Sequence, residues 1–267
     1  LRYYGGQLFK IKQLLKFIPP HRTYVEVFGG AGHFLILKEP SEVEIYNDID
    51  KNLVTFFRVL QDEEKYKKLI WKLKWTLYSR DEYYLARKLL FDDSIDDVTR
   101  AWALYVACRQ SFGGSPTAGW SFDKTVSRDI ESDFYDQTWY EKEFAAVRRR
   151  FRNVQVDSDD WRNILKRYDT KKTFFFLDPP YPPSTVRTSK QYLHNMTEED
   201  HMELAERLKK LEGMFLLITY RTDYYDAMGV NMYDIPSKLH TSSKNKKITV
   251  VTRIYYNYDL NLKLDSL

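Results

Sequence analysis

Cysteine is nearly absent from this 267-residue chain: Cys108 is the only one, which excludes an internal disulfide and a metal site built from several cysteines. It lies in an apolar run, where we expect a small buried core residue. The five histidines lack the spacing of metal ligands, so we expect no metal. No apolar run approaches the roughly 18 residues needed to cross a bilayer, and no signal-peptide pattern opens the chain. These absences predict a cytoplasmic protein without a membrane partner.

Two common nucleotide-binding patterns are also missing. The chain contains neither Gly-x-x-x-x-Gly-Lys-Ser/Thr nor Gly-x-Gly-x-x-Gly. The first absence argues against a P-loop nucleotide hydrolase, and the second disfavours a dinucleotide. We find no internal repeat and no low-complexity segment.

The composition is that of a folded globular protein, with 43% hydrophobic and 30% charged residues. Aromatic residues are abundant, with 21 Tyr, 16 Phe and 6 Trp. Most of them must form the core, although such a surplus also suits stacking on bases. The net charge of +4 permits nucleic acid as a partner without requiring it.

The most informative stretch is residues 174–181, which read Phe-Phe-Phe-Leu-Asp-Pro-Pro-Tyr. The apolar run is short and predicts a buried strand, and the two prolines end it because they have no N–H to donate. Asp178-Pro179-Pro180-Tyr181 would therefore lie at the carboxyl edge of a sheet, where open α/β sheets bind ligands. The carboxylate and a carbonyl can accept hydrogen bonds from a planar amine while the tyrosine stacks on its ring. An ordinary proline-rich turn is the alternative.

Two further predicted strands end in groups suited to a nucleoside. Residues 23–28 run into Gly29-Gly30-Ala31-Gly32 and then a helical pattern, so that Gly30 and Gly32 let the backbone approach a ligand. The predicted strand of residues 43–46 is followed by Asp48, which is placed to accept hydrogen bonds from ribose hydroxyls. The next residue, Ile49, could pack on an adenine face. We expect Asp50 to cap the helix that follows.

A third predicted strand, residues 154–156, leads to Asp160 and Trp161, where an acid and a ring again follow a strand; helix capping is the simpler alternative there. Near the amino terminus, Gly5 and Gly6 suit a close backbone approach to a ligand. Later, Thr197 begins a pattern typical of a helix amino terminus. Residues 231–235 and 249–258 predict an antiparallel pair of strands.

Between residues 62 and 151 the alternation of strands and helices stops, and three segments have helical spacing. The segment predicts a helical domain of residues 62–151, inserted into a domain of residues 1–61 and 152–267. A long loop, residues 109–120, suits nucleic acid, although it could be a glycine-rich loop without function. The candidate DNA contacts are Arg109, Gln110, Ser111, Trp120, Arg187, Lys190, Lys244, Lys246 and Lys247.

These motifs, in this order, resemble those of Dam-like DNA N6-adenine methyltransferases of the alpha group. The shared motifs are Tyr3-Tyr4-Gly5-Gly6-Gln7, Glu26-Val27-Phe28-Gly29-Gly30-Ala31-Gly32, Asn47-Asp48-Ile49-Asp50 and Asp178-Pro179-Pro180-Tyr181. The resemblance implies a Rossmann-like α/β methyltransferase sheet with an inserted, mainly helical target-recognition domain. It also implies S-adenosyl-L-methionine as cofactor, double-stranded DNA as partner, and the cytoplasm of a bacterial or phage-infected cell.

By position, the resemblance makes Tyr3, Gln7, Glu26, Phe28, Asp48, Asp160 and Trp161 cofactor contacts. Two residues depart from the family pattern: Gln7 stands where Lys is usual, and Val27 follows the motif glutamate where Pro is usual. Without the lysine charge, we expect cofactor affinity to be weaker or dependent on DNA. The inserted loop lacks an Arg-Tyr-Asn-type signature, so the resemblance does not imply which DNA sequence the protein recognises.

The implied reaction begins with the target adenine leaving the base stack. Asp178 and the Pro179 carbonyl would accept hydrogen bonds from its N6 amine, and Tyr181 would stack on the base. Methylation of RNA, a free nucleotide or a protein amide is an alternative, as is a catalytically silent DNA-binding relative. We expect a monomer or weak dimer; whether a restriction endonuclease accompanies the protein is left open.

Overall fold

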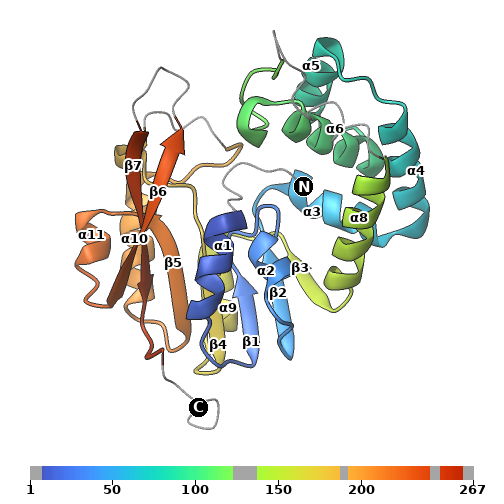
Figure 1. The fold of residues 1–267 in the computed structure, drawn as a ribbon. Helices are drawn as coiled ribbons and strands as arrows, with labels where there is room; N and C mark the ends of the chain where they lie inside the picture. The colour runs from blue at the N-terminus through green and yellow to red at the C-terminus, as the bar shows by residue number, and fades with distance from the viewer. Residues whose placement is uncertain (1–7, 123–136, 187–191, 241–246, 261–267) are drawn as a thin grey trace.

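A seven-stranded sheet forms the centre of the molecule in the computed structural model, which describes residues 8–122, 137–186, 192–240 and 247–260 (Figure 1). The strands are β1 Thr23–Glu26, β2 Val43–Asn47, β3 Val154–Asp157, β4 Thr173–Leu177, β5 Met214–Tyr220, β6 Asn231–His240 and β7 Lys247–Tyr256. Their order is β3-β2-β1-β4-β5-β7-β6. Strands β1 to β5 are parallel to one another, and β7 is antiparallel to both β5 and β6.

The chain changes direction in the sheet between β1 and β4. It runs from β1 to β2 and β3 on one side and then returns to place β4 and β5 on the other. Glu26, the last residue of β1, pairs with Tyr46 of β2 and Phe176 of β4, so the three carboxyl ends lie at one edge. Such a switch point opens a crevice for a ligand.

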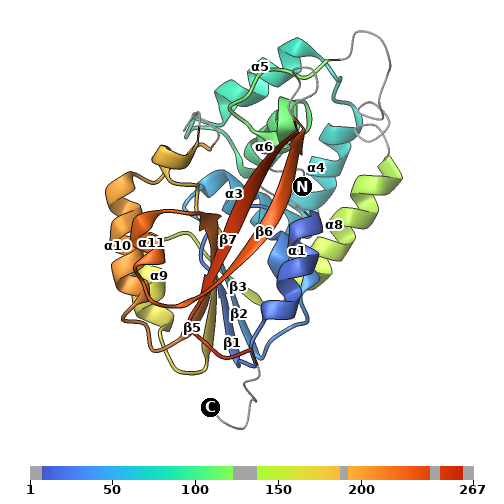
Figure 2. The same ribbon diagram turned by 60° about the vertical axis from the view of Figure 1, so that its left-hand side comes forward.

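Helices cover both faces of the sheet (Figure 2). The described helices are α1 Leu8–Leu14, η1 Leu15–Phe17, α2 His33–Leu37, α3 Lys51–Gln61, α4 Glu63–Lys74, α5 Arg80–Leu89, α6 Asp97–Arg109, η2 Phe112–Gly114, α8 Gln137–Phe151, α9 Trp161–Tyr168, η3 Pro183–Thr185, α10 Glu198–Leu208 and α11 Asp223–Asp226. On β1, Tyr24 packs in the core beside α1 and α2, whereas Val25 faces α9 and α10. All five residues of β4 are buried, as expected for a strand covered on both faces.

Helix α6 lies at the centre of the helical part of the molecule. Every residue from Ala101 to Arg109 is buried, and α3, α4 and α5 pack around it. Burial of consecutive residues all round a helix means that other elements enclose the helix on every side. Phe151 at the end of α8 stacks on Phe57 of α3, with ring centroids 4.3 Å apart, and also meets the edge of Tyr46 in β2. The helices and the sheet thus share one hydrophobic core.

The expected α/β class and Rossmann-like sheet are confirmed, including the antiparallel pair at one edge. Asp50 caps α3 by accepting from Asn52 N, and Thr197 forms a capping box with Asp200, also as expected. The helical segment is present, but α3, which precedes residue 62, packs with it. The domain division at residues 62 and 151 stays a prediction.

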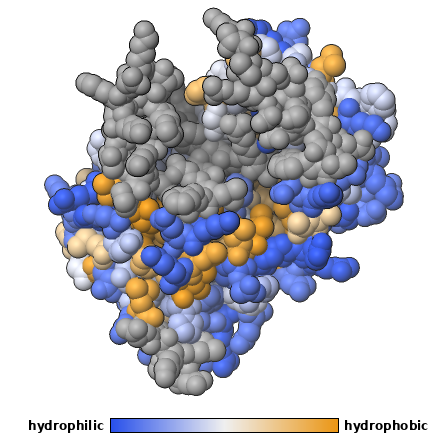
Figure 3. Space-filling model, in the orientation of Figure 1, coloured by the Kyte–Doolittle hydropathy of each residue, from blue (hydrophilic) through white to orange (hydrophobic). Residues whose placement is uncertain are grey.

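The face seen in Figure 1 carries a band of apolar residues across its middle, and hydrophilic residues border this band (Figure 3). Strand β6 exposes apolar side chains, including Met232 and Tyr233. Within the described ranges, no helix has the length and apolar character to cross a bilayer. Nor do the His, Cys, Asp and Glu side chains described there form a group of three or more that could hold a metal ion.

Candidate active site

A cavity of about 440 Å³ opens at the carboxyl edge of β1, β2 and β4. It brings together the ends of three strands that lie up to 150 residues apart in the chain, as the switch point requires. The predicted site residues that line it are Glu26, Phe28, Gly30, Asp48, Ile49, Asp160, Trp161, Asp178, Pro180 and Tyr181. Gly32 starts α2 beside it, and Pro179 is buried behind the lining.

The glycine-rich turn after β1 fits closely against β2. Gly29 N donates a hydrogen bond to Asn47 O at 2.8 Å, and a Cβ atom on Gly29 would lie 2.2 Å from the Tyr46 ring. Gly30 has a φ of 52°, in the left-handed region that favours glycine. These two positions therefore need glycine so that the backbone, without side chains, forms this wall of the cavity.

Glu26 ends β1 and is 2% exposed. Its Oε2 accepts hydrogen bonds from the Tyr24 hydroxyl at 2.7 Å and from Leu35 N, in the first turn of α2, at 2.8 Å. Burial raises the pKa of Glu26 to about 8, with a smaller contribution from the charge of Asp178. The carboxyl group is thus held in one orientation with a strong tendency to stay protonated.

Asp48 follows β2 and is fixed by the backbone. Its Oδ2 accepts from Gly30 N at 2.7 Å, and its Oδ1 accepts from Asp50 N at 2.8 Å. Burial, together with the charge of Asp50, raises the pKa of Asp48 to about 7. Asp50 also lines the cavity; its Oδ1 caps α3, whereas its buried Oδ2 has no hydrogen-bond partner among the described residues.

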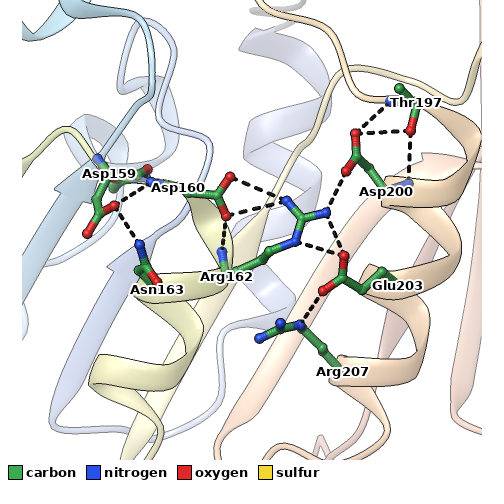
Figure 4. Close-up of polar contacts among 9 residues, drawn as sticks. Asp159, Asp160, Arg162, Asn163, Thr197, Asp200, Glu203 and Arg207 are labelled. Carbon is green, nitrogen blue, oxygen red and sulfur yellow. Dashed lines mark hydrogen bonds and ion pairs between the residues drawn. The ribbon is translucent and has the colours of Figure 1, made fainter.

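Asp160 and Trp161 begin α9 on the opposite wall. Asp160 accepts from Arg162 N at 2.8 Å and caps the helix, and the Trp161 ring is 6% exposed. The Arg162 guanidinium lies over the Trp161 ring, 4.3 Å from its centroid. It also forms ion pairs with Asp160 at 3.3 Å, Asp200 at 2.5 Å and Glu203 at 2.6 Å, and so joins α9 to α10 (Figure 4).

The Asp-Pro-Pro-Tyr turn lies directly after β4, as the sequence predicts. Asp178 and Tyr181 are half-buried in the cavity wall. Tyr181 packs against Tyr220, at the end of β5, with ring centroids 4.4 Å apart and planes at 54°. A carboxylate and an aromatic ring therefore face the same space as Glu26 and Asp48.

Three of the expected DNA contacts are interior residues, which corrects the prediction. Arg109 is 7% exposed, Ser111 2% and Gln110 0%. Gln110 Nε2 donates to Leu77 O, and its Oε1 accepts from Ser79 N; Ser111 Oγ donates to Cys108 O. The Gln110 and Ser111 side chains thus pair backbone groups of the α4–α5 connection and of α6, because buried polar backbone needs partners.

Trp120, one of the predicted DNA contacts, is half-exposed and belongs to a surface group whose other members, Arg80, Phe112 and Phe122, sequence reasoning missed. It stacks on Phe122, with centroids 5.5 Å apart and planes at 19°, and the Arg80 guanidinium lies 5.0 Å from its centroid. Phe122 is 50% exposed, and Phe112 in the same loop is 70% exposed. The exposed rings at Trp120-Ser121-Phe122, two residues apart, are the signal that could have shown this group.

Other wall residues had no clear signal in the sequence. Asn47 donates from Nδ2 to Val27 O at 2.9 Å and to Asp159 O at 3.1 Å, and accepts from Asp159 N, so it joins β1, β2 and the start of α9. Residues 192–196 form a further wall. The predictions for Tyr3, Gly5, Gly6, Gln7, Arg187, Lys190, Lys244 and Lys246 lie outside the described residues. Lys247 begins β7, but its side chain also lies outside them.

Known proteins are similar in sequence to this chain over most of its length. The DNA adenine methylase of Vibrio cholerae serotype O1 is 26% identical over 238 residues, which cover 82% of this chain and 79% of that protein. The type II methyltransferase M.MjaIII of Methanocaldococcus jannaschii is 22% identical over 279 residues, 92% of this chain and 93% of that protein.

A solved structure, titled as a putative rRNA-methylase from Clostridium thermocellum, covers 96% of this chain and 98% of its own at 10% identity. The TM-score between the two structures is 0.36. The model of the D12 class of N6 adenine-specific DNA methyltransferases matches residues 3–257. With the cavity at the switch point and the Asp178 turn in its wall, this match over nearly the whole chain shows that the protein belongs to the D12 class and is a DNA adenine methyltransferase.

Proposed function

We propose that the cavity holds S-adenosyl-L-methionine and a flipped adenine of double-stranded DNA side by side, and that the protein methylates the adenine N6 amine. One observation carries this proposal: the acids Glu26, Asp48 and Asp160 share a single cavity with Asp178 and Tyr181. The cavity has a volume of about 440 Å³. Ligand sites usually have volumes of about 300–1,000 Å³, so the cavity is of the usual size.

The half of the cavity around β1, β2 and α9 suits the cofactor. Asp48 is fixed by two backbone N–H groups and keeps lone pairs for ribose hydroxyls. Glu26 presents Oε1 for a cationic group, because Tyr24 and Leu35 both donate to Oε2. Phe28, Ile49 and Trp161 supply apolar surface for the adenine ring. Bound here, S-adenosyl-L-methionine would supply a methyl group activated by its positively charged sulfur.

The half around β4 and β5 suits the target base. Tyr181, supported by Tyr220, offers a ring on which a flipped adenine can stack. The Asp178 carboxylate would accept a hydrogen bond from the N6 amine and hold its lone pair toward the methyl group. It would then receive the amine proton as the new bond forms. Most of the acceleration would come from this positioning and from the carboxylate charge.

The exposed group Arg80, Phe112, Trp120 and Phe122 is our proposed DNA surface in place of Arg109, Gln110 and Ser111. It combines a cation with aromatic rings on one loop and the start of α5. Arginine attracts phosphates, and exposed rings can stack on bases. The proposal keeps the loop of residues 109–120 that the sequence predicts but assigns other side chains to the contact.

Replacement of Asp178 tests the proposed chemistry. In Asp178→Ala, we expect the methylation rate to fall by at least about 10²–10³-fold, the loss typical of removing one electrostatic catalytic group. Cofactor binding, measured by calorimetry, should largely survive because the acids of the other half are untouched. Asp93→Asn, which changes a fully exposed carboxylate, serves as a matched control with normal activity. Full activity of Asp178→Ala would refute the mechanism, and competition between duplex DNA and RNA tests the substrate.

A further inference from the structure

Tyr46, the fourth residue of β2, is fully buried and lies behind the cavity wall. Its hydroxyl donates a hydrogen bond of 2.6 Å to the carbonyl oxygen of Gly30, which is part of that wall. The side chain thus reaches from the core of the sheet to the backbone of the glycine turn that faces the ligand.

The Tyr46 ring is confined by the elements around it. It meets Phe57 of α3 and Phe151 of α8 edge-on, with ring centroids 5.0 Å and 5.5 Å away. The Gly29 backbone lies against the same ring, since a Cβ atom there would be 2.2 Å from it. Because the ring is enclosed in this way, its hydroxyl has one position and can fix the group to which it donates.

Gly30 is held through both of its backbone polar groups. Its N–H donates to Asp48 Oδ2 at 2.7 Å, and its carbonyl accepts from Tyr46. Gly30 has a φ of 52°, and a glycine has more alternative conformations than any other residue. The two hydrogen bonds therefore select one conformation of a turn that could adopt several.

The bond to Tyr46 also sets the direction of the next N–H group. In a planar trans peptide, the N–H of Ala31 points opposite to the Gly30 carbonyl. Because that carbonyl points back to Tyr46, the N–H points toward the cavity, which Ala31 also lines. This N–H makes no backbone hydrogen bond to another described residue. A backbone donor in the same wall as Glu26 suits a carboxylate.

We propose that Tyr46 is a positioning residue for cofactor binding: its hydroxyl holds the Gly30–Ala31 peptide so that the Ala31 N–H faces the carboxylate of S-adenosyl-L-methionine. Without the hydroxyl, the Gly30 carbonyl loses its partner and the peptide rotates to find another. Tyr46 itself touches neither the cofactor nor the base. This inference rests on the proposed cofactor half of the cavity.

Tyr46→Phe tests the role because it removes the hydroxyl alone and keeps the ring. We expect the KM for S-adenosyl-L-methionine to rise about five- to tenfold, the effect of one lost hydrogen bond, while kcat at saturating cofactor stays within about twofold. Calorimetry in the presence of duplex DNA should show a similar loss of affinity for S-adenosylhomocysteine, which carries the carboxylate. It should show no loss for 5′-methylthioadenosine, which lacks the amino-acid end.

Tyr258→Phe is the matched control. The Tyr258 hydroxyl also donates to a backbone carbonyl at 2.6 Å, that of Phe17, and both residues are buried in the same core. Neither of these two described residues lines the cavity. The two variants should lose a similar amount in unfolding temperature, but only Tyr46→Phe should bind S-adenosylhomocysteine less tightly.

Unchanged affinity of Tyr46→Phe for S-adenosylhomocysteine would overturn the proposal, as would an equal loss for the two ligands or an equal loss in Tyr258→Phe. If Tyr46→Phe fails to fold, Phe151→Leu decides, because it removes one of the rings that confine Tyr46. A loss confined to S-adenosylhomocysteine then supports the role, and unchanged or equally reduced affinities refute it. Failure of the proposed function is distinct, because the original protein would then bind neither ligand.

Discussion

Glu26 and Asp48 are both carboxylic acids that the fold keeps partly protonated at neutral pH. Their pKa values, about 8 and about 7, are raised mainly by burial. A group whose pKa is higher in the folded than in the unfolded state binds more protons when folded. Its stabilising effect is therefore complete below the unfolded value and is lost as the pH rises through the folded one. For these two acids the loss runs from about pH 4 to about pH 8.

Cofactor binding should release protons from these residues. Hydroxyl donors at Asp48 and a cationic group at Glu26 favour the ionised carboxylates and so lower both pKa values. At pH 7 we expect release of about one proton per cofactor bound, and affinity that rises with pH toward 8. Calorimetry in two buffers of different ionisation enthalpy measures the release. Glu26→Gln should reduce it, and equal release by this variant and the original protein would contradict the assignment.

At the scale of elements, the glycine turn after β1 and the pair α9–α10 form the half of the cavity that we propose for the cofactor. The turn depends on the absence of a side chain at Gly29, because the Gly29 backbone lies directly against the fully buried Tyr46 ring of β2. The two helices depend on charge, because one guanidinium joins Asp160 of α9 to Asp200 and Glu203 of α10 (Figure 4). Each device has its own test.

Gly29→Ala should destabilise the protein by about 1–3 kcal/mol or more, because the new methyl group overlaps a ring that cannot leave the core. Chemical denaturation measures the free energy of unfolding. Gly119→Ala is the matched control, since a Cβ atom there meets nothing within 4 Å. Equal stability of the two variants would show that β1 and β2 do not approach as closely as described.

Arg162→Ala should weaken cofactor binding more than it weakens folding. The guanidinium is 29% exposed, so we expect its ion pairs to contribute only about 1 kcal/mol to stability. Its loss frees Asp160 and uncovers the Trp161 ring, and we expect the cofactor Kd to rise about five- to tenfold. Titration calorimetry gives this Kd. Lys209→Ala, which removes an exposed ion pair with Glu206 at the end of α10, should leave the Kd nearly unchanged.

At the scale of the whole molecule, the described helices between residues 62 and 151 share one hydrophobic core with the sheet and with α3. Helix α6 packs against α3, and Phe151 of α8 stacks on Phe57 of α3. Glu44 of β2 forms buried ion pairs with Lys38 and with Arg150 of α8, and the second pair joins the two parts further. A helical segment built in this way takes its orientation directly from the sheet.

Excision tests this dependence. The isolated segment 62–151 should show little helical circular dichroism and no cooperative unfolding, because α6 would expose its side facing α3. A longer segment, 48–151, includes α3 and should have more helix per residue. Cooperative unfolding of 62–151 on its own would establish instead that the predicted domain boundary is also a folding boundary.

The sequence by itself determined the order of strands and helices, the caps at Asp50 and Thr197, and the position of the Asp178 turn at the carboxyl edge of the sheet. These features follow from local rules: apolar periodicity, glycine and proline geometry, and polar groups at helix starts. Because parallel strands bring their carboxyl ends to one edge, the meeting of Glu26, Asp48 and Asp178 also followed from the pattern.

Only the tertiary structure decided which side chains face outward. Gln110 looks like a surface residue in the sequence, yet it pairs backbone groups of residues 77 and 79, about thirty positions away. Tyr220 behind Tyr181 likewise comes from an element distant in the chain. A polar side chain takes the partner that burial leaves unsatisfied, and that partner is fixed by packing rather than by neighbours in sequence.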